Sequence, residues 1–139
     1  MPGLKQPEPV LVAAGVIRDS SGRILIAQRP AGSHAGGFWE FPGGKIQAGE
    51  DAFQALVREL AEEIGIQVFA ASPLMICRHS YPERVVELHV FEVSDSAGEA
   101  RGLEGQPLRW VTVEELGGAG LLEADLPIAA ALMEKWNRG

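Results

Sequence analysis

Hydrophobic and polar positions divide the first part of the chain into short extended segments. Residues 10–17 form a nearly continuous apolar run, which is the pattern of a buried strand. A polar turn follows at 19–22, and residues 23–28 are predicted to return as the second strand of a hairpin. A short aromatic strand at 38–41 then leads into the glycine turn Pro42-Gly43-Gly44. The first third of the chain is therefore predicted to consist of strands joined by turns.

The pattern changes to helical spacing after residue 50. Positions three or four residues apart are apolar and would form the buried face of a helix: Phe53, Leu56, Val57, Leu60 and Ile64. With about 100° between successive residues, Glu59, Glu62 and Glu63 fall within an arc of about 100° on another side. Gly65 is predicted to end the helix, because a residue without a Cβ is favourable at that position. One helix would therefore show an apolar face to the core and a compact acidic surface elsewhere.

The second half of the chain is predicted to contain further strands and a terminal helix. Extended segments are expected at 67–71, 74–79, 84–93 and 108–113, with an interruption at Pro73 and a surface loop at 94–105. Residues 126–136 have helical spacing, with Asp125 as a candidate N-cap. Strands on both sides of one central helix predict an α/β domain in which a mixed β-sheet is sandwiched between helices.

Length and composition limit the class of protein. The 139 residues suffice for one domain, which we place at 9–139 after a disordered lead-in at 1–8. No apolar run approaches the ~20 residues needed to cross a bilayer, and the N-terminus lacks a signal pattern. Cys77 is the single cysteine and cannot form an internal disulfide, which suits a reducing compartment. We therefore expect a cytoplasmic monomer or weak dimer without a membrane partner.

The concentration of acidic residues on one helix needs an explanation. Two like charges about 4 Å apart repel by roughly 4 kcal/mol at an effective dielectric near 20. A divalent cation removes that penalty, and oxygen ligands favour Mg²⁺, with Mn²⁺ as an alternative. A solvated acidic face is the usual explanation of such a run, but the neighbouring glycine turn, Glu50 and Arg58 favour a metal. The net charge of −7 argues against long nucleic acid and leaves a single nucleotide open as a ligand, because a metal supplies local positive charge.

The same stretch matches a known family motif. Gly44, then Glu50, then Arg58-Glu59-Leu60-x-Glu62-Glu63-x-Gly65-Ile66 resembles the Nudix box in full, with nine fixed positions over 23 residues. Residues 40–45 and 104–107 also look like MutT-type members of that family. The resemblance implies a Nudix fold and an enzyme that hydrolyses a nucleoside diphosphate linked to a further group. MutT-type members cut nucleoside triphosphates to the monophosphate and pyrophosphate and prefer oxidised guanine nucleotides.

The resemblance also implies roles for particular residues. The metal-binding positions match the Gly43 carbonyl and the side chains of Glu59, Glu62, Glu63 and Glu104. Glu59 is the first candidate for the general base that activates water, and Glu104 is the second. Glu50 matches a position that supports the metal ligands. Arg58 is expected to hold a glutamate in place rather than touch substrate, because its planar fork suits carboxylates.

A second set of positions is expected to contact the nucleotide: Arg29, His34, Glu40, Phe41, Pro42, Lys45, Arg84 and Asp125. Arg29, Lys45 and Arg84 are candidate phosphate contacts, although Lys45 and Arg84 could equally be solvated surface charges. His34 matches a position beside the base or ribose, but a loop histidine is often incidental. Phe41 is a candidate wall of the base pocket, where an aromatic face can meet a purine.

Asp125 departs from the MutT pattern, which carries an asparagine that reads the oxidised base. Asparagine both donates and accepts, whereas an ionised aspartate only accepts. An acceptor can bind guanine N1–H and its exocyclic amine but loses any bond to O6, and it can also accept from the amine of cytosine. Asp125 could alternatively be only a helix cap.

Three functions are therefore open. The first is Mg²⁺-dependent sanitation of oxidised nucleoside triphosphates, 8-oxo-dGTP first, which prevents mutation. The second keeps the chemistry and changes the base to modified cytidine or another non-standard nucleotide. The third is a nucleotide-binding module without catalysis, which would be expected to lose box carboxylates that this chain retains.

Overall fold

A computed structural model describes residues 8–136 and contains two sheets. The larger sheet has the order β4-β1-β6-β5, and the smaller has the order β3-β2-β7. Their strands are β1 (Val10–Val16), β2 (Ile24–Gln28), β3 (Trp39–Glu40), β4 (Gly43–Lys45), β5 (Gln67–Tyr81), β6 (Arg84–Ala97) and β7 (Leu108–Val111). Strands β1 and β6 are parallel and their other neighbours are antiparallel, which confirms the predicted mixed α/β architecture.

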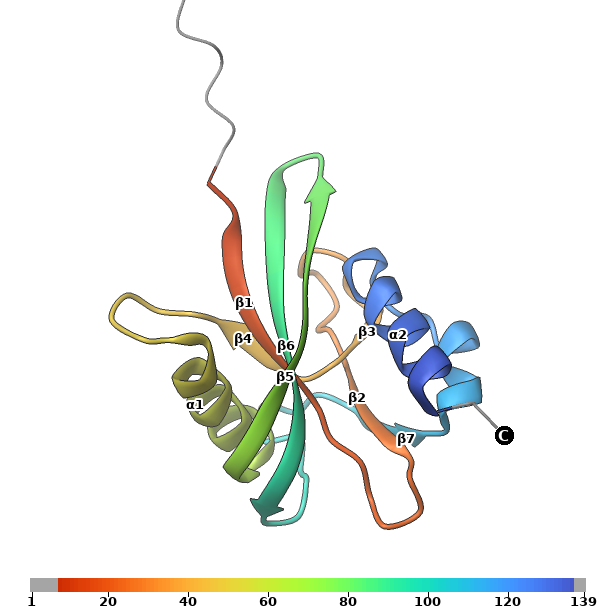
Figure 1. The fold of residues 1–139 in the computed structure, drawn as a ribbon. Coiled ribbons are helices and arrows are strands. Elements are labelled where there is room, and N and C mark those ends of the chain that lie inside the picture. The colour runs from red at the N-terminus through yellow and green to blue at the C-terminus, as the bar shows by residue number, and fades with distance from the viewer. Residues whose placement is uncertain (1–7, 137–139) are drawn as a thin grey trace, which may run out of the picture.

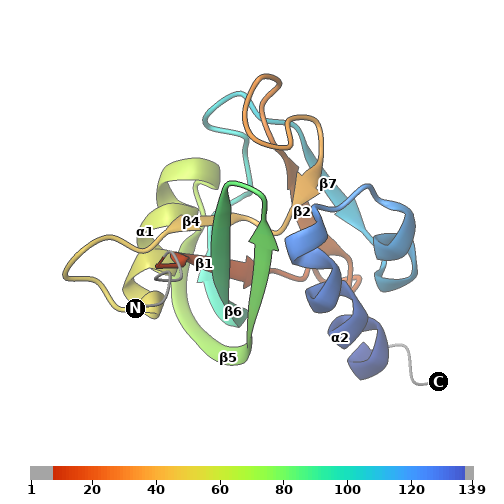
Figure 2. The same ribbon diagram turned by 90° about the horizontal axis from the view of Figure 1, so that it is seen from above.

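Two helices lie on opposite sides of the larger sheet, as Figures 1 and 2 show. Helix α1 (Ala52–Ile64) begins with the capping box of Asp51 and Gln54 and ends at Gly65, which has a left-handed φ of 71°. This confirms the helix and its predicted end. Helix α2 (Leu126–Trp136) follows two short 3₁₀ helices, η1 (Val113–Gly118) and η2 (Glu123–Asp125).

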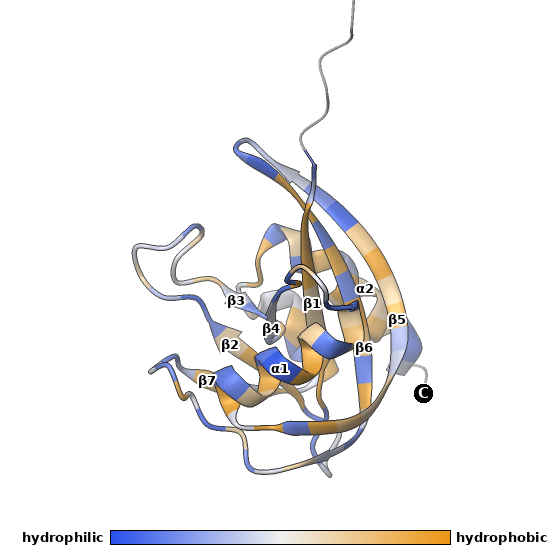
Figure 3. Cartoon of the chain, turned by 90° about the vertical axis from the view of Figure 1, so that its left-hand side faces the viewer, coloured by the Kyte–Doolittle hydropathy of each residue, from blue (hydrophilic) through white to orange (hydrophobic). Residues whose placement is uncertain are grey.

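Alternation along β1 supplies two hydrophobic cores, one on each face of the sheet. Ala13 packs in the core with Leu56 and Leu60 of α1, whereas Ala14 packs in the core with Leu132 of α2. Each fully buried leucine stabilises the fold by roughly 1.5–3 kcal/mol relative to an exposed one. Figure 3 shows the same contrast on α1, which carries both hydrophobic and hydrophilic bands. The core that contains Ala13 fixes α1 against the sheet that carries β4.

The predicted hairpin of 10–17 with 23–28 is wrong beyond its turn. An isolated bridge joins Arg18 to Ile24, but β1 and β2 then diverge into different sheets. Both edges of β1 are occupied, by β4 and by β6, so β2 pairs with β3 and β7 instead.

Two further boundaries differ from the prediction. Strand β5 runs without a break from Gln67 to Tyr81, and register shifts absorb Pro73. Proline is tolerated there because β5 is the edge strand, where a missing N–H costs no ladder bond. Strand β6 continues to Ala97, because its polar end pairs with the start of β5, so the predicted loop at 94–105 is shorter.

The glycine turn also contributes structure, since residues 43–45 form the short strand β4 against β1. No helix within residues 8–136 is both long and apolar enough to cross a membrane. The predicted disordered lead-in falls almost wholly on residues outside the described range.

Candidate active site

A cavity of about 720 Å³ opens where the two sheets and α1 meet. Its lining includes most of the predicted site residues: Arg29, His34, Glu40, Phe41, Gly43, Lys45, Glu59, Glu63, Arg84, Glu104 and Asp125. Pro42, Glu50, Arg58 and Glu62 do not line it. The Pro42 carbonyl accepts a hydrogen bond from Gly15 N–H at 2.8 Å, so its contact is with β1 rather than with the cavity. A substrate contact at Pro42 stays a prediction.

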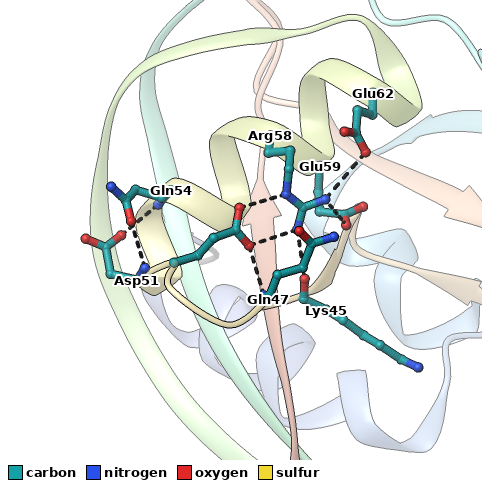
Figure 4. A network of polar contacts seen from close by, with 8 residues as sticks. Lys45, Gln47, Asp51, Gln54, Arg58, Glu59 and Glu62 are labelled. Carbon is teal, nitrogen blue, oxygen red and sulfur yellow. Dashed lines mark hydrogen bonds and ion pairs between the residues drawn. The ribbon is translucent and has the colours of Figure 1, made fainter.

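Arg58 organises the acidic residues around the N-terminal half of α1 (Figure 4). Its Nε and Nη2 donate to the two carboxylate oxygens of Glu50 at 2.7 and 3.0 Å, and its Nη1 donates to Glu59 at 2.6 Å. Nη2 also donates to the Lys45 carbonyl at 2.9 Å, which ties the helix to β4. The arginine hydrogen bonds lower the pKa of Glu50. The guanidinium is thus occupied by protein groups and anchors both glutamates.

Glu59 and Glu63 lie side by side at the cavity, one helical turn apart. Burial, the neighbouring Glu59 carboxyl group and the charges of Glu104 and Glu40 all raise the pKa of Glu63. Gly44 permits this arrangement, because a Cβ at that position would collide with the Glu59 carboxylate. The site therefore concentrates carboxylates whose mutual repulsion favours a proton or a cation between them.

Glu62 does not line the cavity, unlike the other two glutamates of the helix. Its side chain is 61% exposed, and its carboxylate faces Arg58 Nη1 at 3.4 Å instead of the cavity. The same Arg58 nitrogen donates to Glu59 at 2.6 Å, so Glu59 and Glu62 share this arginine, and of the two only Glu59 lines the cavity. Among residues 8–136, no three or more Asp, Glu, His or Cys side chains are arranged to hold a metal ion. The predicted ligand set of three helix glutamates would need Glu62 to rotate toward the cavity.

The basic residues of the cavity differ in how they are held. Arg29 Nη1 pairs with Glu40 at 3.0 Å, and its Nε donates to the His34 carbonyl at 2.7 Å. Burial raises the pKa of Glu40, and the Arg29 charge opposes that rise. Arg29 therefore joins the loop after β2 to β3 through its Nε and Nη1 groups, and the rest of its guanidinium group could contact a ligand. The charged groups of Lys45 and Arg84 make no ion pair with any residue between 8 and 136, which leaves them available to anions.

Asp125 forms the most buried polar contact of the cavity. It is 4% exposed, and its Oδ2 accepts a hydrogen bond from Phe41 N–H at 2.9 Å. Burial raises the pKa of Asp125 to about 7. The residue ends η2 immediately before α2, but this bond goes to the segment after β3 rather than to an amide of α2. Asp125 thus belongs to the cavity wall beside Phe41.

Comparison with known proteins assigns this arrangement to a family. The model of the NUDIX domain matches residues 13–131. The chain belongs to the Nudix family. It is 42% identical over 123 residues to the CTP pyrophosphohydrolase of Escherichia coli, covering 88% of this chain and 90% of that protein. It is 48% identical over 94 residues to the 8-oxo-dGTP diphosphatase of Proteus vulgaris, covering 68% and 84%.

Comparison with solved structures supports the same family assignment. A solved MutT structure, from work on the Aliivibrio salmonicida and Vibrio cholerae proteins, superposes with a TM-score of 0.80 at 35% identity. The match covers 93% of this chain and all of that one. This Nudix protein is therefore a MutT-type pyrophosphohydrolase, and the predicted fold and enzyme class are confirmed. Nudix hydrolases generally use divalent metals, and the clustered carboxylates of this chain fit a hard cation.

Sequence reasoning missed two side chains of this Nudix site, Tyr81 and Gln106. The Tyr81 hydroxyl accepts from Ala124 N–H at 3.1 Å, and its ring meets that of His34 edge-on, 4.7 Å between centroids. His34 Nε2 is buried and has no partner among residues 8–136. Nothing in the local sequence pattern marks Tyr81 as a site residue. Gln106 lies within the motif at 104–107, which is the signal that could have identified it.

Proposed function

We propose that this enzyme hydrolyses nucleoside triphosphates to the monophosphate and pyrophosphate with Mg²⁺, taking oxidised guanine nucleotides such as 8-oxo-dGTP first. The observation that carries the proposal is a single cavity with carboxylates at one end and the Asp125–Phe41 pair at the other. Glu40 interacts electrostatically with both Glu63 and Asp125, so it lies near both groups. This arrangement accommodates a triphosphate at the acidic end and a base beside Phe41.

Glu59, Glu62, Glu63, Glu104 and the Gly43 carbonyl are the groups that would hold Mg²⁺, or Mn²⁺ in its place. When bound, the ion would neutralise phosphate charge and lower the pKa of water. Glu59 would accept the proton of the attacking water, as its position in the cavity between Arg58 and Glu63 allows. The water oxygen forms a bond to phosphorus as the P–O bond between the α- and β-phosphates breaks, which gives the nucleoside monophosphate and pyrophosphate. Glu50 and Arg58 hold Glu59 in the required orientation.

The triphosphate needs positive charge beyond the metal, and Arg29, Lys45 and Arg84 line the cavity. Lys45 and Arg84 have no competing carboxylate within the described chain, so they would pair with phosphate oxygens. Arg29 would contribute from its pair with Glu40. Loss of either Lys45 or Arg84 would raise KM for the triphosphate with little change in kcat, since each would hold the substrate rather than the reacting atoms.

A second candidate keeps the reaction and changes the base to a modified cytidine. The relative named CTP pyrophosphohydrolase is 42% identical, and the ionised Asp125 can accept from the exocyclic amine of cytosine. The guanine proposal is supported instead by the relatives named 8-oxo-dGTP diphosphatase. Both bases carry an exocyclic amine that could donate to Asp125.

The deciding experiment is a panel of substrates with the purified protein and Mg²⁺: 8-oxo-dGTP, dGTP, 5-hydroxy-CTP and ADP-ribose. Release of pyrophosphate or phosphate gives kcat/KM for each. The proposal requires kcat/KM for 8-oxo-dGTP to exceed that for dGTP by at least about tenfold, equivalent to one good hydrogen bond. Equal values would reject sanitation of oxidised guanine, and a preference for the cytidine nucleotide would establish the second candidate. Excess EDTA should abolish turnover, and Mg²⁺ should restore it.

A further inference from the structure

The loop that carries Glu104 is joined to the C-terminal end of α1. The last carbonyls of a helix have no partners within the helix. Here Ile64 O accepts from Arg101 N–H at 2.9 Å, and Glu63 O accepts from Leu103 N–H at 3.0 Å. The loop therefore caps the end of the helix that presents Glu63.

Gln106 adds a second connection of a different kind. Its Nε2 donates to Glu63 O at 3.0 Å, and its Oε1 accepts from Glu104 N–H at 2.9 Å. One planar amide thus joins the backbones of two residues whose carboxylates line the cavity. A Cβ at Gly102 would collide with the Gln106 carbonyl, so the loop closes tightly behind the amide. One N–H and one oxygen lone pair of the amide are used by backbone groups, which links Gln106 structurally to both Glu63 and Glu104.

We propose that Gln106 is a positioning residue, which fixes Glu104 relative to Glu63 so that both carboxylates act on the same metal–nucleotide complex. Glu104 is exposed and lies on a loop, so nothing in its own side chain holds it in place. Residues that orient a metal ligand or a general base typically change affinity or rate by about 10- to 100-fold when removed. This inference rests on the proposed hydrolysis, and its test separates the two.

The experiment compares Gln106→Met, which keeps length and volume but removes both bonds, with Gln106→Ala. Gln54→Ala is the matched control, because Gln54 also makes a side-chain bond to a backbone amide, at the other end of α1. The readouts are kcat and KM with the best triphosphate and Mg²⁺, and nucleotide-free Mn²⁺ binding followed by electron paramagnetic resonance. We expect both Gln106 variants to lower kcat about 10- to 100-fold and to weaken Mn²⁺ binding by about tenfold, with KM within about threefold. Gln54→Ala should change none of these.

A double variant tests whether Gln106 acts through Glu104. If it does, Gln106→Met in a Glu104→Gln background should lower kcat by less than about threefold, because the positioned group is already lost. Additive effects would overturn the inference, as would a Gln106→Met variant with unchanged kcat and Mn²⁺ affinity. If the unmodified enzyme hydrolyses no triphosphate, the proposed function fails, while Mn²⁺ binding by the same variants still decides the role of Gln106.

Discussion

Phe41 N–H donates a 2.9 Å hydrogen bond to the carboxylate of Asp125, which joins the segment after β3 to the end of η2. The two residues are far apart in the chain, and both are almost completely buried. The bond stabilises the ionised form of Asp125, but burial opposes it more strongly and raises the pKa to about 7. This relationship leads to one prediction about stability and another about substrate choice.

Ionisation of the buried Asp125 should lower the stability of the protein as the pH rises from about 4 to 8. A carboxyl whose folded pKa lies above its unfolded value stabilises the fold fully below the unfolded pKa and loses that contribution as pH rises through the folded pKa. The interval from 3.8 to about 7 corresponds to roughly 4 kcal/mol of unfolding free energy. Asp125→Asn removes the ionisation, so the variant should be more stable than the parent at pH 8 and less dependent on pH. Urea unfolding at pH 5 and pH 8 measures both.

The control for that measurement is Asp95→Asn, on an exposed position of β6. The change in unfolding free energy between pH 5 and pH 8 should be the same in this variant as in the parent protein. If Asp125→Asn and Asp95→Asn have the same effect, the pH dependence arises elsewhere.

The same substitution should move substrate preference toward guanine nucleotides. An amide at position 125 can still accept from Phe41 N–H, and it adds a donor that can reach O6 of guanine. We expect the ratio of kcat/KM for 8-oxo-dGTP to that for the cytidine nucleotide to rise by about tenfold, the effect of one hydrogen bond. Steady-state kinetics with both substrates give the ratio directly. An unchanged ratio would show that Asp125 supports the cavity wall without reading the base.

Glu59→Gln should lower kcat by about 10²- to 10⁴-fold while nucleotide binding is largely kept. The amide retains an acceptor and the shape of the side chain but can no longer take a proton from water. Single-turnover rates separate chemistry from binding, and an exposed substitution on η1, Glu114→Gln, is the control. A smaller loss than that of Glu104→Gln would assign the general base to Glu104 instead.

Local patterns predicted the parts of this fold that depend on neighbours in the chain. The apolar spacing of Leu56 and Leu60 identified the buried face of α1, and Gly65 ended the helix as expected because its left-handed φ favours glycine. Strand pairing between segments that are distant in the sequence could not be predicted from such local patterns. The partner of β2 is decided by β4 and β6 occupying both edges of β1.

In the site, too, local sequence predicted some features, whereas others depend on contacts between distant segments. Helical geometry placed Glu62 on the acidic arc with Glu59, but the Glu62 side chain is 61% exposed beside Arg58 and does not line the cavity. Gln106 is positioned by its contact with Glu63, and Tyr81 by its contact with Ala124. In each pair the two residues are more than 40 positions apart in the sequence. No periodicity within a segment encodes such contacts.

Gly44→Ala should lower kcat far more than any accompanying loss of folding stability could explain. A Cβ at Gly44 would meet the Glu59 carboxylate, so the glutamate would have to move away from its position beside Arg58 and Glu63. A displacement of about 1 Å at such a group can cost about 100-fold in rate, and we expect kcat to fall by that order. Gly117→Ala is the matched control, since its Cβ would meet nothing within 4 Å. Comparable kcat for the two variants, after correction for the folded fraction, would show that Glu59 tolerates the shift and does not need the close approach of β4.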